Sequence, residues 1–425
     1  MNKQGIETIM QAIGKDARNA ASHLINITAE QRKKALILMA KYINESVDAI
    51  IEANSQDLFR AKKIYMNDAL IDRLLMDKTR IYNIGTSLHQ IAELDDPVGQ
   101  IISEWSRPNG INIRKIRTPI GIIGMIYESR PNVTVEASAL CIKSGNVAIL
   151  RGGRDALNTS KALFSCIQKG IIEAGLPEKT IQLITITDHC VVSNMLSGLD
   201  GNLDILIPRG GRKLMQRVRE EAKIPILSHQ EGICHLYVDK SANLTMAKNL
   251  IINSKLRRTS ICGATETLLI DNQLRLNDII DIITSLNNQG CEVRICKSLM
   301  ESITENHKFL AATSSDWGVE FMDSIISVKL VNGIDGAISH IHRYSSGHTD
   351  GIIASDTNAV TKFFAEVNSA LVMHNISTQF ADGGEFGFGG EIGISTGKLH
   401  ARGPIGAEQL TSFKYHLSGN GQIRY

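Results

Sequence analysis

Apolar residues along the first hundred positions recur every three or four residues, which is typical of amphipathic helices. Thr28 marks one helix start, because a hydroxyl residue with a glutamine three positions later, here Gln31, is the sequence pattern of a capping box. Apolar residues then repeat at helical spacing from Ala35 to Ile43, and similar periodicity continues to Leu94, before Pro97. This pattern predicts a helical amino-terminal region.

Two segments of alternating character follow, at residues 101–105 and 111–116, and Arg107-Pro108-Asn109-Gly110 joins them. The Asn-Gly pair accepts the positive φ angles of a tight hairpin. An isolated two-stranded hairpin is marginal in water, so the pattern fits either a surface ribbon or a ribbon that crosses to another subunit. Residues 411–425 also read as extended chain, with a turn at residues 419–421.

From Gly121 onward, short apolar strands alternate with helices, which is the signature of a mostly parallel sheet. We predict strands at residues 146–150, 203–207 and 265–270 and helices at residues 160–174, 213–222 and 244–256. The chain has no low-complexity segment and no long linker, so its structural units should be interleaved rather than arranged in series.

The bulk properties narrow the class of protein. A chain of 425 residues is too long for one compact core. Its 46 Lys and Arg against 44 Asp and Glu give a formal charge of +2, which provides no basic surface for nucleic acid or an anionic membrane. The amino terminus lacks the apolar core of a signal peptide, and the most apolar run, residues 120–127, is too short for a bilayer. Seven irregularly spaced cysteines without a CxxC pair suit neither a disulfide framework nor a zinc site. We expect a reduced cytoplasmic enzyme without a metal.

Two turns resemble one another. Arg151-Gly152-Gly153 and Arg209-Gly210-Gly211 each lie between a predicted strand and a predicted helix. Glycines let a ligand approach the backbone, a helix start offers free N–H groups, and arginine adds a forked cationic donor, so both turns suit phosphate. The alternative is a pair of ordinary glycine turns with solvated arginines. Because GxGxxG is absent from both turns, a dinucleotide would bind differently from that in the common dehydrogenases.

Among the cysteines, Cys262 has the surroundings of a nucleophile. It lies between the helix at residues 244–256 and the strand at residues 265–270, and the small residue Gly263 follows it. Cations on the preceding segment, at Lys255, Arg257 and Arg258, would favour its thiolate. The alternative is a small buried apolar side chain, the usual fate of a free cysteine. Local context alone leaves both open.

Several longer segments resemble the glutamate-5-semialdehyde dehydrogenase family, also called γ-glutamyl phosphate reductases, of the aldehyde dehydrogenase superfamily. They are YESRPNVT at residues 127–134, CIKSGNVAILRGG at 141–153, LIPRGG at 206–211, GICH at 232–235, SGH at 346–348 and the block at 384–406 with EIGIST and KLHARGP. The likeness runs from the amino-terminal helices to the last residues and is specific to this family.

The resemblance implies an α/β fold of the aldehyde dehydrogenase type, with two Rossmann-like parallel-sheet domains and a small β oligomerisation element. Residues 1–103 and 121–233 would form the cofactor-binding domain and residues 234–404 the catalytic domain. Residues 104–120 and 405–425 would supply the oligomerisation strands.

The resemblance also implies roles for single residues. Cys262 matches the catalytic thiol, and Asn132 matches the asparagine that forms an oxyanion hole with the Cys262 N–H. The two Arg-Gly-Gly turns match segments near the phosphate and ribose groups of the cofactor. Glu320 falls where the superfamily holds the nicotinamide ribose. His348 and Arg402 are candidate substrate contacts. The alternative is a structural role for His348 and a packing or subunit-contact role for Arg402.

The chain departs from the family pattern at residues 373–378, where MHNIST replaces a VNAST-like run, and in two places that bear on the chemistry. Gly263 stands where the family commonly has Asn, and Thr259 and Ser260 stand in the region where it has Pro. The ELGG glutamate that activates water in oxidising aldehyde dehydrogenases has no clean match in His229-Gln230-Glu231-Gly232, so Glu231 stays unassigned. A base of that kind is needed only when a thioester is hydrolysed.

The implied reaction is the reduction of L-glutamyl 5-phosphate by NADPH, through a Cys262 thioester, to L-glutamate 5-semialdehyde and phosphate in proline biosynthesis. The chain has no kinase domain, so glutamate 5-kinase would supply the acyl phosphate, and more than one subunit is expected. Three alternatives stay open: an oxidising aldehyde dehydrogenase that hydrolyses its thioester, a thiol acyltransferase or hydrolase without nicotinamide, and an inactive scaffold.

Overall fold

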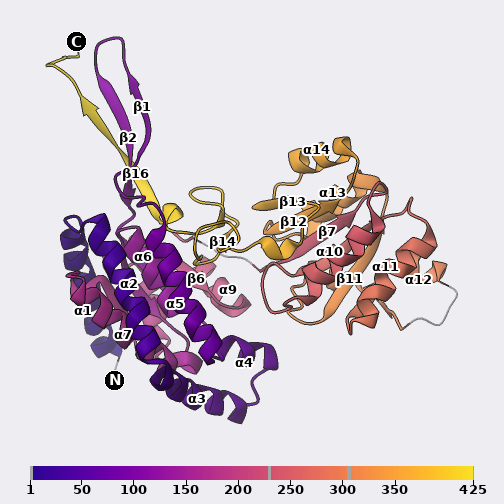
Figure 1. Cartoon of the computed structure of the whole chain (residues 1–425), viewed down its shortest axis with the longest axis horizontal. Coiled ribbons are helices and arrows are strands. Elements are labelled where there is room, and N and C mark those ends of the chain that lie inside the picture. The colour runs from indigo at the N-terminus through magenta and orange to yellow at the C-terminus, as the bar shows by residue number, and fades with distance from the viewer. Residues whose placement is uncertain (1–2, 228–230, 304–307, 425) are drawn as a thin grey trace. The chain divides into compact units, whose positions relative to one another are not determined.

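The computed structural model describes residues 3–227, 231–303 and 308–424. The chain forms two compact units, coloured by residue number in Figure 1. Unit 1 comprises Met1–His229, Gly387–Gly393 and Ile405–Tyr425, and unit 2 comprises Gln230–Phe386 and Ile394–Pro404. Residues 387–393 thus belong with the first unit, inside the range that the resemblance assigned to the catalytic domain. The functional names of the domains stay predictions.

Unit 1 is built on a parallel four-stranded sheet in the order β5-β4-β3-β6. The central strand β3 is buried along its whole length, which explains its unbroken apolar sequence. The sheet strands are β3 (Ile122–Tyr127), β4 (Val147–Arg151), β5 (Ile181–Leu183) and β6 (Ile205–Arg209). The helices are α1 (Lys3–Leu24), α2 (Ala29–Glu45), α3 (Val47–Lys63), α4 (Asp68–Leu74), α5 (Lys78–Glu93), α6 (Val133–Lys143), α7 (Leu157–Glu173), α8 (Cys190–Leu196) and α9 (Arg212–Glu221).

The amino-terminal helices follow the predicted pattern. The buried residues of α1 recur every three or four positions, from Ile6 to Leu24. At the start of α2 the Thr28 hydroxyl accepts the Gln31 N–H at 3.2 Å, and the Gln31 side chain accepts the Thr28 N–H at 3.0 Å. This confirms the capping box. Helix α7 lies against α2 at Gly170, where a Cβ would come within 2.7 Å of the Met39 nitrogen.

The hairpin prediction is also confirmed. Strands β1 (Ile101–Ser106) and β2 (Asn112–Pro119) pair antiparallel, and Gly110 in their turn has a φ of 85°. The carboxyl-terminal strand β16 (Thr411–Ser418) pairs antiparallel with the other edge of β2, which gives a three-stranded sheet in the order β1-β2-β16. Figure 1 shows these three strands extending away from the helices of unit 1.

Unit 2 is built on a parallel seven-stranded sheet in the order β10-β9-β11-β8-β7-β12-β13. Its strands are β7 (Cys234–Val238), β8 (Thr265–Asp271), β9 (Glu292–Ile295), β10 (Leu310–Ala311), β11 (Ile325–Val331), β12 (Thr349–Ile353) and β13 (Leu371–His374). Its helices are α10 (Leu244–Leu256), α11 (Leu276–Asn288), α12 (Lys297–Ser302), α13 (Gly333–Tyr344) and α14 (Thr357–Glu366). A small antiparallel pair, β14 (Ile394–Ser395) and β15 (Gly403–Pro404), belongs to the same unit.

Helices cover both faces of this sheet. Since successive strand residues point to opposite sides, neighbouring residues of one strand pack against different helices. On β8, Leu268 and Ile270 pack in one buried cluster with α10, α11 and α12. Leu269, between them, packs in a second cluster with α13 and α14. No helix of the described residues is long and apolar enough to cross a membrane.

Candidate active site

In unit 1, the parallel order of the sheet brings both Arg-Gly-Gly turns to one edge. Strands β4 and β6 flank β3, so their carboxyl ends, at Arg151 and Arg209, lie on either side of the end of β3. The carboxyl ends of parallel strands are the usual place for ligands in open α/β sheets. The predicted turns therefore share the edge of the unit 1 sheet at which open α/β sheets usually bind ligands.

Glu128, the residue after β3, connects the end of β3 to the turn that follows β6. Its N–H donates to the Arg209 carbonyl at 3.0 Å, and its Oε2 accepts the Gly211 N–H at 3.0 Å, at the start of α9. A Cβ on Gly210 would lie 2.5 Å from the same Oε2, so glycine is what permits this approach. The N–H at the start of α9 thus already holds an anionic group. Sequence reasoning missed Glu128, although it lies inside the YESRPNVT motif.

The two arginines of these turns are half-buried rather than fully solvated. The Arg209 guanidinium donates through Nη1 to the Ile392 carbonyl and so holds the segment at residues 387–393, which belongs to the same unit. The Arg151 Nε is buried and has no hydrogen-bond partner within the part of the chain that the structure describes. Burial lowers the pKa of Arg151, and the nearby carboxylates of Glu128 and Asp155 oppose that shift. Phosphate contacts by these arginines stay predictions.

Asn132 lies at the turn between β3 and α6. Its side-chain Nδ2 donates to Glu136 Oε1 at 3.0 Å, one helical turn further on. The same turn contains Ser129, whose φ of 47° is unusual for a non-glycine residue and whose hydroxyl donates to Asp155. The side-chain amide of Asn132 is therefore a hydrogen-bond donor fixed beside the end of β3.

In unit 2, Cys262 lies in the turn between α10 and β8, both of which have the predicted bounds within one residue. The Cys262 side chain is half-buried and packs against a small cluster of Leu371, Met373, Ala381 and Ile394. Its carbonyl accepts the thiol of Cys234 at 3.0 Å. Gly232 lies so close that a Cβ there would be 2.0 Å from the Cys262 oxygen. Strand β7 and its preceding residues therefore support the backbone of Cys262.

The cations that precede Cys262 have partners of their own. Lys255 is fully buried and its ammonium donates to Glu266 Oε2 at 2.5 Å. Burial raises the pKa of Glu266 to about 7, while Lys255 opposes the shift and Glu320 adds to it. Arg257 Nε donates to Gln379 Oε1 at 3.0 Å, and the Arg258 carbonyl accepts the Gln379 amide at 3.2 Å. These contacts fix the Cys262 turn to other parts of unit 2.

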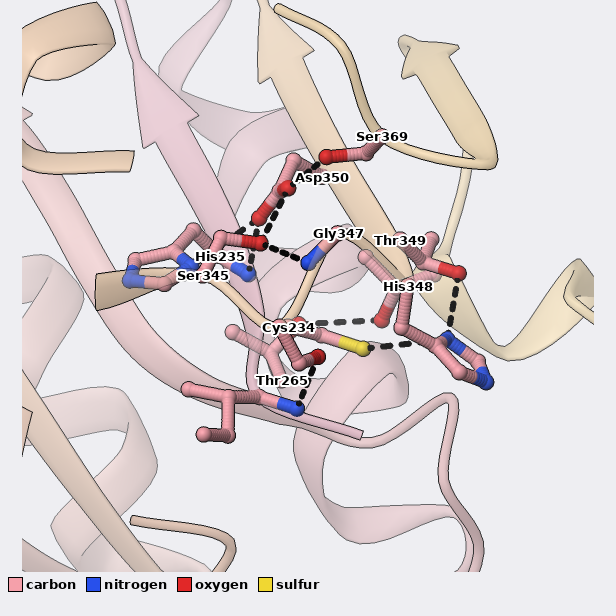
Figure 2. Close-up of polar contacts among 12 residues, drawn as sticks. Cys234, His235, Thr265, Ser345, Gly347, His348, Thr349, Asp350 and Ser369 are labelled. Carbon is pink, nitrogen blue, oxygen red and sulfur yellow. Dashed lines mark hydrogen bonds and ion pairs between the residues drawn. The ribbon is translucent and has the colours of Figure 1, made fainter. Parts of the chain in front are cut away.

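His348 is fully buried and lies directly before β12. Its Nδ1 lies 2.8 Å from Thr349 Oγ1 and 3.7 Å from Cys234 Sγ, as Figure 2 shows. The turn before it is fixed by Asp350, which accepts the Ser345 hydroxyl at 2.7 Å and the His235 Nδ1 at 2.9 Å (Figure 2). These contacts fit the structural alternative for His348.

Arg402 and Glu320 complete the candidate residues of unit 2. Arg402 Nη1 donates to Asn368 Oδ1 at 2.8 Å, and its Nη2 donates to the Asn368 carbonyl, which fits the packing alternative. Glu320 is half-buried and precedes Met322, whose φ is 55°. The candidate residues thus divide into Asn132 and the two turns in unit 1, and Cys262, Glu320, His348 and Arg402 in unit 2. Their joint action stays a prediction.

Comparison with known proteins shows which family this is. The sequence model of the aldehyde dehydrogenase family matches residues 3–284. The γ-glutamyl phosphate reductase of Bartonella quintana is 52% identical over 415 residues, which cover 98% of this chain and 100% of that protein. The crystal structure of γ-glutamyl phosphate reductase from Thermotoga maritima superposes with a TM-score of 0.92 at 40% identity. The match covers 98% of this chain and 100% of that chain. The chain belongs to the γ-glutamyl phosphate reductases of the aldehyde dehydrogenase family.

The fold extends beyond this branch of the family. An acetylating aldehyde dehydrogenase from Geobacillus thermoglucosidasius superposes with a TM-score of 0.71 at 16% identity, over 99% of this chain and 98% of that one. At that identity the likeness concerns the fold alone. It confirms the predicted aldehyde dehydrogenase-like α/β architecture.

One departure from the aldehyde dehydrogenase pattern has a physical reason. A Cβ on Gly263 would lie 2.9 Å from the Thr378 carbonyl oxygen, so the residue after Cys262 has little room for a side chain. The other departure falls partly on His229 and Gln230, which lie outside the described residues. Glu231 therefore stays unassigned.

Proposed function

We propose that this chain reduces L-glutamyl 5-phosphate to L-glutamate 5-semialdehyde and phosphate, with NADPH, as a step of proline biosynthesis. The observation that carries the proposal is the full-length match, at 52% identity, to a γ-glutamyl phosphate reductase. The reaction needs a thiol and an amide donor, and the resemblance assigns these roles to Cys262 and Asn132.

The chemistry of these two residues follows from the substrate. The Cys262 thiolate attacks the γ-carbonyl carbon of the acyl phosphate, and the negative oxygen that develops is stabilised by the Asn132 amide and the Cys262 N–H. Losing one such donor typically costs about 3 kcal/mol, or on the order of a hundredfold in rate. Phosphate leaves, and the acyl group remains on Cys262 as a thioester. Because phosphate departs by itself, no water-activating base is required.

Aldehyde dehydrogenases use a nicotinamide cofactor, and the residues of unit 1 fit one. The two Arg-Gly-Gly turns share one sheet edge, and the buried Arg151 Nε has no hydrogen-bond partner among the described residues. These groups would hold the cofactor's phosphates, and Glu320 would hold the nicotinamide ribose. The chemistry that a bound nicotinamide supplies is hydride transfer to the carbonyl carbon of the thioester. The two arginines support NADPH over NADH. Expulsion of the Cys262 thiolate then releases the semialdehyde.

The experiment that tests the proposal runs the reaction backwards. Glutamate 5-semialdehyde should be oxidised with NADP⁺ only when inorganic phosphate is present, and more slowly with NAD⁺. Oxidation without phosphate would instead show a hydrolytic aldehyde dehydrogenase. Absence of nicotinamide turnover in both directions would favour the acyltransferase or scaffold alternatives.

Two variants make the test specific for the thiol. Cys262→Ala should abolish phosphate-dependent turnover while the protein keeps its fold. Cys291→Ala removes a buried thiol elsewhere in unit 2 and should leave turnover at the wild-type level. Retained turnover in Cys262→Ala would overturn the assignment of the nucleophile.

Two partners belong to the proposal. The acyl phosphate is labile and must be made by a separate kinase, for which glutamate 5-kinase has the required chemistry.

A homo-oligomer is proposed through the β1-β2-β16 sheet, since exposed apolar side chains such as Phe413 and Leu417 lie on it. A cytoplasmic location stays a prediction from the sequence.

A further inference from the structure

We propose that Cys234 is a positioning residue for the Cys262 nucleophile, with its thiol holding the backbone carbonyl of residue 262 and His348 fixing that thiol in place. The inference rests on the proposed function, in which Cys262 attacks the substrate. All of the residues that it uses lie in unit 2.

The first step is the position of Cys262 on an irregular turn rather than on a helix or strand. The Ala264 N–H closes this turn by donating to the Ile261 carbonyl at 3.1 Å. The Cys262 carbonyl points out of the turn toward β7, where the Cys234 thiol donates to it at 3.0 Å. A bond to this carbonyl limits rotation of the backbone that carries the nucleophilic side chain and its N–H.

The second step is the state of the Cys234 side chain. Cys234 is fully buried, and burial raises the pKa of its thiol well above the ordinary range, with further contributions from Asp350, Cys262 and Glu266. The group therefore keeps its proton at neutral pH. A protonated thiol can donate to a carbonyl, whereas a thiolate cannot.

The third step is what holds the Cys234 sulfur. His348 Nδ1 lies 3.7 Å from Cys234 Sγ and 2.8 Å from Thr349 Oγ1, and all three side chains are drawn in Figure 2. The Asp350 carboxylate joins the segments that carry Cys234 and His348. It accepts the backbone N–H of His235, next to Cys234, at 3.0 Å and the Ser345 hydroxyl, in the turn before His348, at 2.7 Å. The segments 232–235 and 346–350 thus form one rigid support for residue 262.

The test compares four variants at position 234 and elsewhere. Cys234→Ala and Cys234→Val remove the donor, and the valine keeps the volume if the alanine variant fails to fold. Cys234→Ser keeps a donor at the same place. Cys291→Ala is the matched control, because Cys291 is also a buried thiol of unit 2 and its sulfur contacts the Glu292 carbonyl at 3.8 Å.

The measurements are kcat, the KM for NADPH, and the rate at which iodoacetamide alkylates Cys262, followed by peptide mass spectrometry. Because a neutral hydrogen bond is modest, Cys234→Ala and Cys234→Val should lower kcat about three- to tenfold and slow alkylation similarly. The KM for NADPH should stay unchanged. Cys234→Ser should recover most of the loss, and Cys291→Ala should show wild-type kcat.

Three results would overturn the inference: wild-type kcat in the alanine and valine variants, no recovery in the serine variant, or an equal loss in Cys291→Ala. Failure of the proposed function itself would be seen separately, as retained turnover in Cys262→Ala. The two failures are therefore distinguishable.

Discussion

At residue 232 the chain has no space for a side chain. A Cβ there would lie 2.0 Å from the Cys262 oxygen and 2.6 Å from its Cα, and both are backbone atoms that cannot rotate away. We expect Gly232→Ala to lower the free energy of unfolding by about 1–3 kcal/mol, as overpacking does, and to alter alkylation of Cys262. Denaturant unfolding followed by Trp317 fluorescence, in a Trp105→Phe background, reports on unit 2.

The matched control is Gly318→Ala. Among the described residues, the nearest atom to a Cβ on Gly318 would be in the Tyr344 ring, at 3.9 Å, which is ordinary van der Waals distance. This variant should unfold within about 0.5 kcal/mol of the wild type, as most uncrowded substitutions do. Wild-type stability and alkylation in Gly232→Ala would contradict the close contact between residue 232 and the Cys262 turn.

Asn132 gives a second prediction for a single residue. Asn132→Ala removes the proposed oxyanion donor and should lower kcat about a hundredfold, with little change in the KM for NADPH. Steady-state kinetics in the reductive direction measure both quantities. Glu136→Gln is the control, because it keeps an acceptor for the Asn132 amide and should change kcat far less. A kcat within twofold of the wild type in Asn132→Ala would remove this residue from the mechanism.

Residues with family motifs could be named from the sequence, but their supporting partners could not. Asn132 stands in the YESRPNVT motif, whereas Cys262 was named from its local surroundings and from the resemblance of the whole chain. Glu128 and Cys234 lie inside quoted motifs, yet their roles depend on contacts with Gly211 and Cys262, which only the sheet order creates. Periodicity and spacing report local structure and carry no information on which distant turns meet.

At the scale of elements, the buried pair Lys255–Glu266 links α10 to β8 and should make stability depend on pH. The folded state raises the pKa of Glu266 to about 7 from an ordinary value of 4.5. The native state therefore binds this proton more tightly than the unfolded chain, so its contribution is present below pH 4.5 and is lost as pH rises through about 7.

Glu266→Gln cannot titrate, so the difference between wild type and variant isolates this group. The free energy of unfolding of the wild type, relative to Glu266→Gln, should fall between about pH 5 and pH 8 by at most about 3 kcal/mol, since one pKa unit corresponds to about 1.4 kcal/mol. Unfolding followed by Trp317 at several pH values measures it. Ser302→Ala removes an exposed hydroxyl of unit 2 and no titratable group, so it is the control and should run parallel to the wild type. If the free energy of unfolding of Glu266→Gln changed with pH in parallel with that of the wild type, the prediction would be wrong.

The capping box of α2 carries a simpler prediction. Thr28→Ala removes the acceptor for the Gln31 N–H and should cost about 1 kcal/mol. Thr86→Ala in α5 is the control, because that hydroxyl is exposed and donates to the Tyr82 carbonyl of its own helix at 3.1 Å. Unfolding followed by circular dichroism should show a loss for Thr28→Ala and almost none for Thr86→Ala. Equal losses would mean that the cap has no special role.

Elements were predictable where the signal is local. The predicted helix at residues 244–256 has the observed bounds of α10, and the predicted strand at residues 203–207 overlaps β6 (Ile205–Arg209). Strand order was not predictable, because pairing joins segments far apart in the chain. The tail was predicted to be extended, but its pairing with β2 and the place of residues 387–393 in unit 1 follow only from tertiary contacts.

At the scale of the whole molecule, the β1-β2-β16 sheet has edge strands that a second copy could cover. Phe413, Tyr415 and Leu417 alternate along β16 and are 46%, 50% and 62% exposed, and the Tyr415 ring lies edge-on to Trp105 of β1 at 6.2 Å. Residues two apart on a strand share a face, so these side chains form one exposed apolar surface. Such a surface is unfavourable in water unless it is covered.

We expect this surface to be the contact between copies of the chain. Phe413→Glu with Leu417→Glu places two charges on it and should convert the oligomer into a monomer, because a buried unpaired carboxylate is costly. Ser412→Glu with His416→Glu places the same number of carboxylates on the opposite face of β16 and should keep the oligomer. Sedimentation velocity at micromolar concentration measures the mass of each. A wild type that is already monomeric, or two variants that dissociate equally, would show that the apolar face of β16 is not the contact; dissociation of the first variant alone would assign that face to assembly.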